Sequence, residues 1–104
     1  MATELHRTAF RATTNPQSIT IPAAAAGSTL VCVTMGGAVI TAKLGVGGTS
    51  FTKRTPTALN QLEVACQDIT AVGGETTIQI AMNALRGTDG VIYEFAAGTL
   101  GANS

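Results

Sequence analysis

The sequence predicts an all-β protein: an antiparallel β-sandwich, Ig-like or jelly-roll-like, of about seven or eight short strands. Three observations predict this fold. Apolar and polar residues alternate with period two in several short runs, which is typical of strands with one buried face. Segments rich in Gly or Pro separate these runs and predict turns. No segment convincingly predicts a helix.

The clearest strand signal lies between residues 62 and 95, in three runs. In each run one set of alternate residues shares an apolar face: Leu62, Val64 and Cys66, then Ile78, Ile80 and Met82, then Val91, Tyr93 and Phe95. Gly73-Gly74 and the segment 86–90 are the expected turns between the runs. We expect all the aromatic side chains to lie in the core: Phe10, Phe51, Tyr93 and Phe95.

Five more strands are expected earlier in the chain: Thr8–Thr13, Gln17–Ile21, Thr29–Met35, Val39–Leu44 and Ser50–Arg54. Asn15-Pro16 predicts a turn, and the sequence PAAAAG at 22–27 predicts either one helical turn or a compact loop. The strand Thr29–Met35 is apolar on both faces. It is therefore expected at the centre of a sheet, or covered on its outer side by another subunit.

The chain is expected to form a single domain over residues 1–104. Residues 1–7 are expected as an extended N-terminal arm, and residues 97–104 as a tail of small residues that is loose or lies along a neighbouring molecule. Only 12% of residues are charged, against about 25% in a typical soluble domain. This composition fits a compact free domain or, better, a subunit whose surface is largely covered by neighbours.

Charge and hydropathy also exclude some partners. Six Lys and Arg balance six Asp and Glu, and neither Arg7 with Arg11 nor Lys53-Arg54 forms a basic stripe, so no nucleic-acid partner is predicted. The uncharged run Ile21–Ala42 is long enough to cross a bilayer. It contains Pro22 and three glycines and changes to period two, so strand, loop and strand are preferred to a membrane helix. The N-terminal residues show no signal-peptide pattern.

No reactive cluster is evident. Cys32 and Cys66 are expected as buried thiols, with a single bridge between adjacent strands as the alternative. Because His6 is the only histidine and no CxxC occurs, no metal site is predicted. The Gly45-x-Gly47 segment lacks the third glycine and the helix of a dinucleotide fingerprint, so no cofactor is expected.

The remaining candidate catalytic groups are few. His6 lies in the arm, which is a poor place for precise geometry. Asp68 and Asp89 are expected in turns. Glu94 is expected to be partly buried and therefore paired, with Lys43, Lys53 or Arg86 as the cation. No catalytic residue and no small-molecule substrate is predicted.

Several segments together resemble a β-sandwich module found in structural proteins of tailed bacteriophages and in some bacterial surface proteins. They are GSTLVCVTM, ITAKLGVGGTSFTK, LEVACQDITAVGGETTIQI and VIYEFAAG, which cover roughly residues 19–98. The resemblance consists of strand patterns with glycines and the Tyr93-Glu94-Phe95 sequence, and includes no reactive residues. The short hairpin between Lys43 and Phe51 departs from the module because it lacks the usual Asp-Gly-Asn-type turn.

The resemblance implies a phage virion structural protein and not an enzyme, most simply a capsid decoration or cement subunit. Its partners would be copies of itself and the major capsid protein, and its location the virion, assembled in the host cytoplasm. The alternative is a tail-fibre or adhesin-type module that binds a host surface through loops 45–48, 55–61 and 83–90. Candidate interface residues in the arm, first strand and tail are Leu5, His6, Arg7, Arg11 and Leu100.

Overall fold

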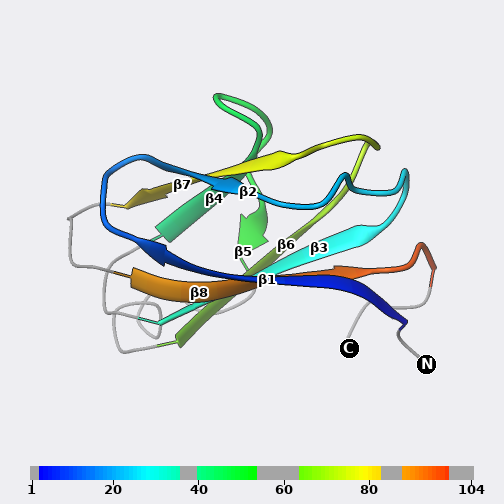
Figure 1. Ribbon diagram of the computed structural model, residues 1–104, viewed down its shortest axis with the longest axis horizontal. Coiled ribbons are helices and arrows are strands. Elements are labelled where there is room, and N and C mark those ends of the chain that lie inside the picture. The colour runs from blue at the N-terminus through cyan, green and yellow to red at the C-terminus, as the bar shows by residue number, and fades with distance from the viewer. Residues whose placement is uncertain (1–2, 36–39, 54–63, 83–87, 99–104) are drawn as a thin grey trace.

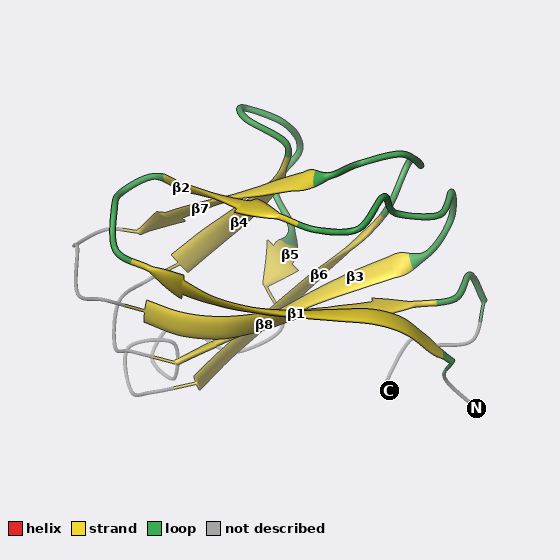
Figure 2. Cartoon of the chain, in the orientation of Figure 1, coloured by secondary structure: helices red, strands yellow, loops and turns green. Residues whose placement is uncertain are grey.

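The computed structural model of the chain describes residues 3–35, 40–53, 64–82 and 88–98, and it confirms the all-β prediction. No helix occurs in these residues (Figure 2). Their eight strands are β1 (Glu4–Ala12), β2 (Gln17–Thr20), β3 (Thr29–Met35), β4 (Ile40–Leu44), β5 (Thr52–Lys53), β6 (Val64–Thr70), β7 (Thr77–Met82) and β8 (Thr88–Phe95).

The strands form two antiparallel sheets that pack as layers (Figure 1). One sheet has the order β1-β8-β3-β6-β5 and the other the order β2-β7-β4. This strand order is that of a jelly roll, with β1, β8, β3 and β6 in one sheet and β2, β7 and β4 in the other. It distinguishes the fold from the Ig-like alternative. β5 departs from that arrangement because it pairs with β6, while Ser50, two residues before β5, forms an isolated bridge to Lys43 of β4.

The predicted turn residues shape the connections. Asn15 precedes a cis proline, and its side-chain amide exchanges hydrogen bonds with the backbone of Met82 at 2.7 and 3.1 Å. The segment 22–27 is a compact loop and not a helical turn, because Ala24 donates its backbone N–H to Glu75 of the facing turn. Gly73 and Gly74 turn with φ of 123° and 86°, values that favour glycine.

The core lies between the two sheets and is built from alternate residues of the facing strands. The prediction that Ile78, Ile80 and Met82 share a buried face is confirmed. The prediction that β3 is a central strand is also confirmed, because β8 and β6 flank it. The buried apolar residues are Ala12, Ile19, Ile21, Ala24, Leu30, Cys32, Ala42, Phe51, Ala71, Ile78, Ile80, Met82 and Ile92.

Several expected boundaries differ. Residues 4–7, expected in the arm, form the first part of β1 because they pair with the end of β8 across a bulge at Leu5. Residues 88–90, expected in a turn, begin β8 and pair with both β1 and β3. Asp68 and Asp89, also expected in turns, therefore lie in strands β6 and β8. The chain segments 55–61 and 99–104 lie outside the described residues.

Candidate functional site

The most distinctive surface of the molecule is the side of the five-stranded sheet that faces away from the core. Strand register places alternate residues there, and their side chains are half-buried or exposed, while on β3 and β8 the residues between them are buried. We call this surface the outer face and define it by its apolar residues: Ala9, Val31, Val33, Met35, Cys66, Val91, Tyr93 and Phe95.

Aromatic residues cover one part of the outer face. The rings of Tyr93 and Phe95 stack with centroids 6.1 Å apart, and the Arg7 guanidinium lies 5.1 Å from the centre of the Tyr93 ring. The prediction that Tyr93 and Phe95 lie in the core is wrong, whereas Phe51 is buried and Phe10 packs partly against the core. Alternation in β8 correctly grouped these residues but did not determine which group faces inward.

The inner side of the same sheet combines apolar and polar groups. Four polar side chains are almost fully buried there, Thr34, Gln67, Thr88 and Glu94, among apolar core residues such as Leu30, Cys32 and Ile92. The outer face presents valines and stacked aromatics. Monomeric proteins rarely expose a large contiguous apolar patch. The outer face is therefore the strongest candidate for contact with another molecule.

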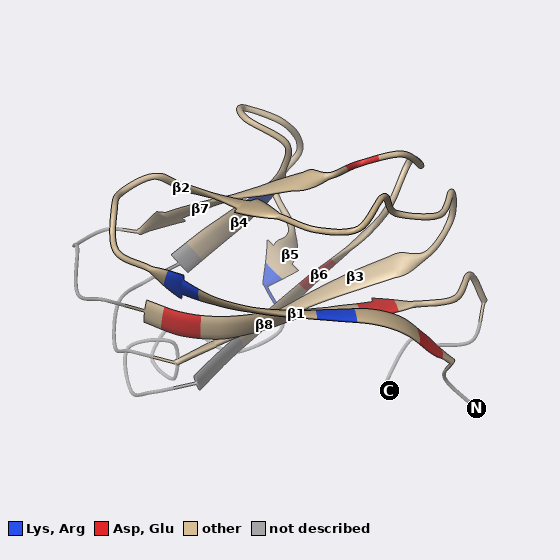
Figure 3. Ribbon diagram, viewed as in Figure 1, with Lys and Arg blue, Asp and Glu red and all other residues tan. Residues whose placement is uncertain are grey.

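The charged residues of the long strands of this sheet lie on β1, β8 and β6 (Figure 3). On β1, Arg7 donates a 2.9 Å hydrogen bond to Glu4, whose carboxylate raises the pKa of Arg7. At the far end of β1, Arg11 contacts Asp89 of β8 at 3.2 Å. The central strand β3 carries no charged residue. This is an apolar centre with a charged rim, as in many protein interfaces.

The predicted interface residues divide between the two sides of β1. Arg7 and Arg11 lie at the rim of the outer face, with 61% and 63% of their side chains exposed. His6 pairs in register with Glu94 and belongs to the other side of the strand. Leu5, 42% exposed, lies at the bulge, and Leu100 lies outside the described residues. Sequence reasoning missed the contribution of β8, because it assigned Tyr93 and Phe95 to the core.

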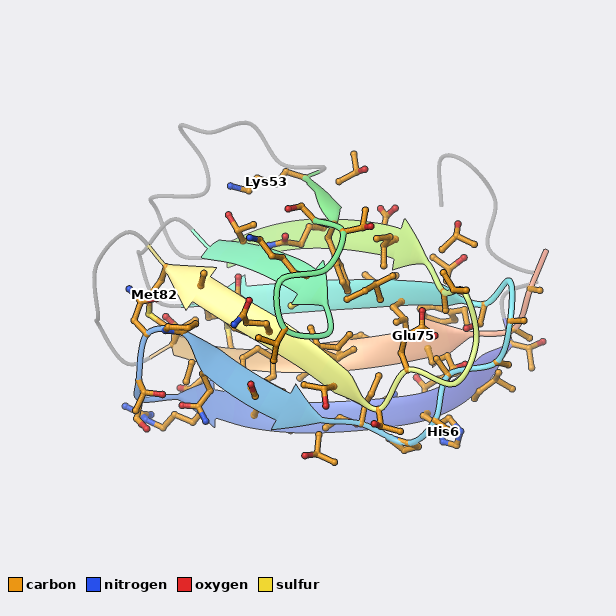
Figure 4. The ribbon with its side chains drawn as sticks, turned by 90° about the horizontal axis from the view of Figure 1, so that it is seen from above. His6, Lys53, Glu75 and Met82 are labelled. Atoms are coloured by element: carbon orange, nitrogen blue, oxygen red, sulfur yellow. The ribbon has the colours of Figure 1, made fainter. Side chains whose placement is uncertain are left out.

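Glu94 has different partners from those expected. Its carboxylate accepts a 2.8 Å hydrogen bond from the backbone N–H of Ala25 and lies 3.9 Å from Nε2 of His6. Lys43 and Lys53 belong to β4 and β5, away from Glu94. Figure 4 shows His6 and Lys53 at opposite margins of the molecule. Arg86 lies outside the described residues.

The surroundings of Glu94 are tightly packed. A hollow beside it is lined by His6, Thr8 and apolar residues, and has no interior space for a water molecule. His6 and Asp68, the two residues considered for catalysis, lie on opposite sides of the sheet with β8 and β3 between their strands. Within the described ranges, no cluster of three metal-ligating side chains occurs.

The two cysteines lie on adjacent strands but face opposite ways. Cys66 pairs in register with Val33, one residue beyond Cys32, so Cys32 points into the core and Cys66 to the outer face. They are not bridged. Burial, with a smaller contribution from the neighbouring Cys66, raises the pKa of Cys32 to about 12. Cys32 is the buried thiol that was expected, and Cys66 is half-buried.

The loops considered for host binding are only partly described. The tip 45–48 is a hairpin turn with positive φ at Gly45 and Gly47, and Val46 is 74% exposed. No described helix is long and apolar enough to cross a membrane. Comparison with protein families, with curated proteins and with solved structures found no match to this chain.

Proposed function

We propose that this protein is a structural subunit of a tailed-phage particle, a capsid decoration or cement protein. It would stabilise the particle by packing its outer face against neighbouring subunits. The observation that carries the proposal is the apolar centre of the outer face, where Val31, Val33 and Val91 lie half-buried on the side of the five-stranded sheet that faces away from the core. Burial of such a face upon assembly contributes roughly 25 cal/mol for each Å² of apolar surface.

Three further features support this function. The chain has few charges and a net charge of zero, which favours association over free dispersal. Its jelly-roll strand order is common in viral capsid domains, although it also occurs in lectins and so supports the role by analogy only. Repetition over a shell would strengthen many modest contacts through multivalency.

The test is co-sedimentation with shells of the major capsid protein encoded in the same genome. Two lysine substitutions form a matched pair: Val33→Lys alters the outer face, and Val72→Lys alters a 79% exposed valine in the turn before β7. Wild type and Val72→Lys should bind the shells, and Val33→Lys should bind at least about tenfold more weakly. Thermal unfolding establishes that both variants fold.

Two outcomes would contradict the proposal. One is a folded wild-type protein that does not bind shells, and the other is equal binding by both variants. The fibre or adhesin alternative predicts instead that the protein binds host cells or their glycans, and that Val46→Lys at the exposed hairpin tip weakens this binding.

A further inference from the structure

One cross-strand row of the outer face carries opposite charges on the first and last of the four long strands. Arg7 of β1 pairs in register with Tyr93 of β8, Tyr93 with Val31 of β3, and Val31 with Asp68 of β6. Across these four strands the row begins with a cation, continues through two apolar residues and reaches an anion, and Thr52 of the short strand β5 continues it beyond Asp68. The two charged residues are three strand spacings apart, about 14 Å.

A two-fold axis along the strands, between β8 and β3, would make this row complementary to itself. The rotation places β1 of one copy over β6 of the other, and β8 over β3. Arg7 then faces Asp68 of the second copy, and the same pair forms again by symmetry. Tyr93 faces Val31, and in the next row Val91 faces Val33, so the remaining contacts along both rows are apolar.

We propose that the outer face binds a second copy of this chain, face to face, about this strand-parallel two-fold axis, with Arg7 and Asp68 paired across the interface. The inference deepens the proposed function, on which it rests, by naming the partner and the orientation. Both charges have contacts in their own chain, Arg7 with Glu4 and Asp68 with another group. The contact between Arg7 and Asp68 of the two copies would be additional to these, and it would contribute mainly to the orientation and specificity of the dimer.

The orientation follows from comparison with the other face-to-face arrangement. An axis across the strands would stack β1 on β1 and β8 on β8. Register would then place Asp68 against Cys66 and Asp89 against Phe95 of the second copy. These contacts would bury carboxylates against less polar groups, at a cost in desolvation. That axis would also oppose Arg11 to Glu4, near the strand ends. The strand-parallel axis instead pairs Asp68 with Arg7 at the centre of the face, and the carboxylate that it sets against an apolar side chain, Asp89 against Met35, lies near the strand ends beside Arg11. The central row therefore favours the strand-parallel axis.

The size of the face sets the expected affinity. Four long strands about 4.8 Å apart, with about seven residues at 3.4 Å each, cover roughly 450 Å² per copy. Stable complexes bury about 800 Å² per partner. The isolated dimer should therefore be weak, with a Kd of about 10–100 μM.

Sedimentation equilibrium of charge-reversal variants tests the pairing. Arg7→Asp and Asp68→Arg should each raise the dimer Kd about tenfold, and the double variant should return it to within about threefold of wild type. Arg11→Asp is the matched control, because it reverses an equally exposed arginine of the same strand. It should change the Kd by less than about threefold. Thermal unfolding in dilute solution establishes that every variant folds.

Three results would overturn the inference: a wild-type chain that stays monomeric up to about 1 mM, single reversals without effect, or a double variant without rescue. Failure here is distinct from failure of the proposed function. If Val33→Lys still abolishes shell binding while the charge reversals change nothing, the face is an interface for another partner. If the reversals behave as expected but no shell is bound, the dimer stands and the capsid role does not.

Discussion

The side-chain oxygen of Gln67 in β6 accepts a 2.9 Å hydrogen bond from the backbone N–H of Ala42 in β4. Both residues are almost fully buried. Because β4 is the last strand of its sheet, this N–H at the open edge would otherwise lack an acceptor from a neighbouring strand of that sheet. A side chain of the five-stranded sheet thus completes the hydrogen bonding of the three-stranded sheet and joins the two layers.

Replacement of Gln67 by Leu should therefore destabilise the protein by about 1–3 kcal/mol, because it leaves the buried Ala42 N–H without this acceptor. In a domain of this size each kcal/mol lowers Tm by about 4–8 °C. Urea and thermal unfolding measure both quantities. Gln79→Leu is the control, since Gln79 accepts an exposed hydrogen bond from Gly47. Equal losses in the two variants would show that the buried bond has no special role.

Glu94 should matter for stability through its acceptor oxygen and not through His6. Glu94→Ala leaves the Ala25 N–H without its side-chain acceptor and opens a cavity, so a loss of about 2–4 kcal/mol is expected. Glu94→Gln keeps a side-chain oxygen and should lose less. His6→Ala should change stability by less than about 1 kcal/mol, because the His6 side chain is 45% exposed and 3.9 Å from the carboxylate. A large loss in His6→Ala would contradict this account.

The turn at Glu75 predicts a specific pH dependence. Burial raises the pKa of Glu75, but backbone N–H groups at Val72, Glu75 and Gly73 outweigh this effect, so the pKa lies below its usual value of 4.5. The two intra-turn bonds from Val72 and Gly73 measure 2.8 and 2.7 Å. A lowered pKa contributes stability above the unfolded-state value, and this contribution disappears as pH falls through the folded-state value.

Wild type should therefore have a higher Tm than Glu75→Gln at pH 7, and the difference should shrink as pH falls below about 4.5. Scanning calorimetry across this range provides the measurement. A difference in Tm that stays constant down to about pH 2.5 would show that the carboxylate charge is not the source of the stabilisation.

The two cysteines should react very differently with a thiol reagent. In dilute solution at pH 8 we expect one fast-reacting thiol per chain, because Cys66 is half-buried at the outer face while Cys32 is buried with a raised pKa. The fast reaction should be lost in Cys66→Ser, and two thiols should react after unfolding. Two fast thiols, or none, in the folded wild type would contradict the described strand register. Slower reaction at high concentration would be expected if a second copy covers the face.

Sequence alone determined which residues share a strand and a face in β3 and β7, but not the full extent of β1 and β8. Period-two alternation predicts β3 and β7 at their observed bounds. Asn15-Pro16 and Gly73-Gly74 predict the observed turns. Both kinds of feature depend on neighbouring residues and local backbone geometry, so the sequence is sufficient to predict them. The apolar character of both faces of β3 also pointed to a covered outer side, which remains a prediction about assembly.

Only the tertiary structure decided which face of each strand points inward and which strands are neighbours. Tyr93 and Phe95 lie outside and Glu94 inside because β8 pairs with β1 and β3, so that Ile92 aligns with the inward-facing Cys32. Alternation is unchanged when a strand is turned over, so it cannot choose between these faces. The juxtapositions of Arg7 with Tyr93 and of Gln67 with Ala42 likewise arise from pairing and sheet packing between distant segments, which local patterns do not encode.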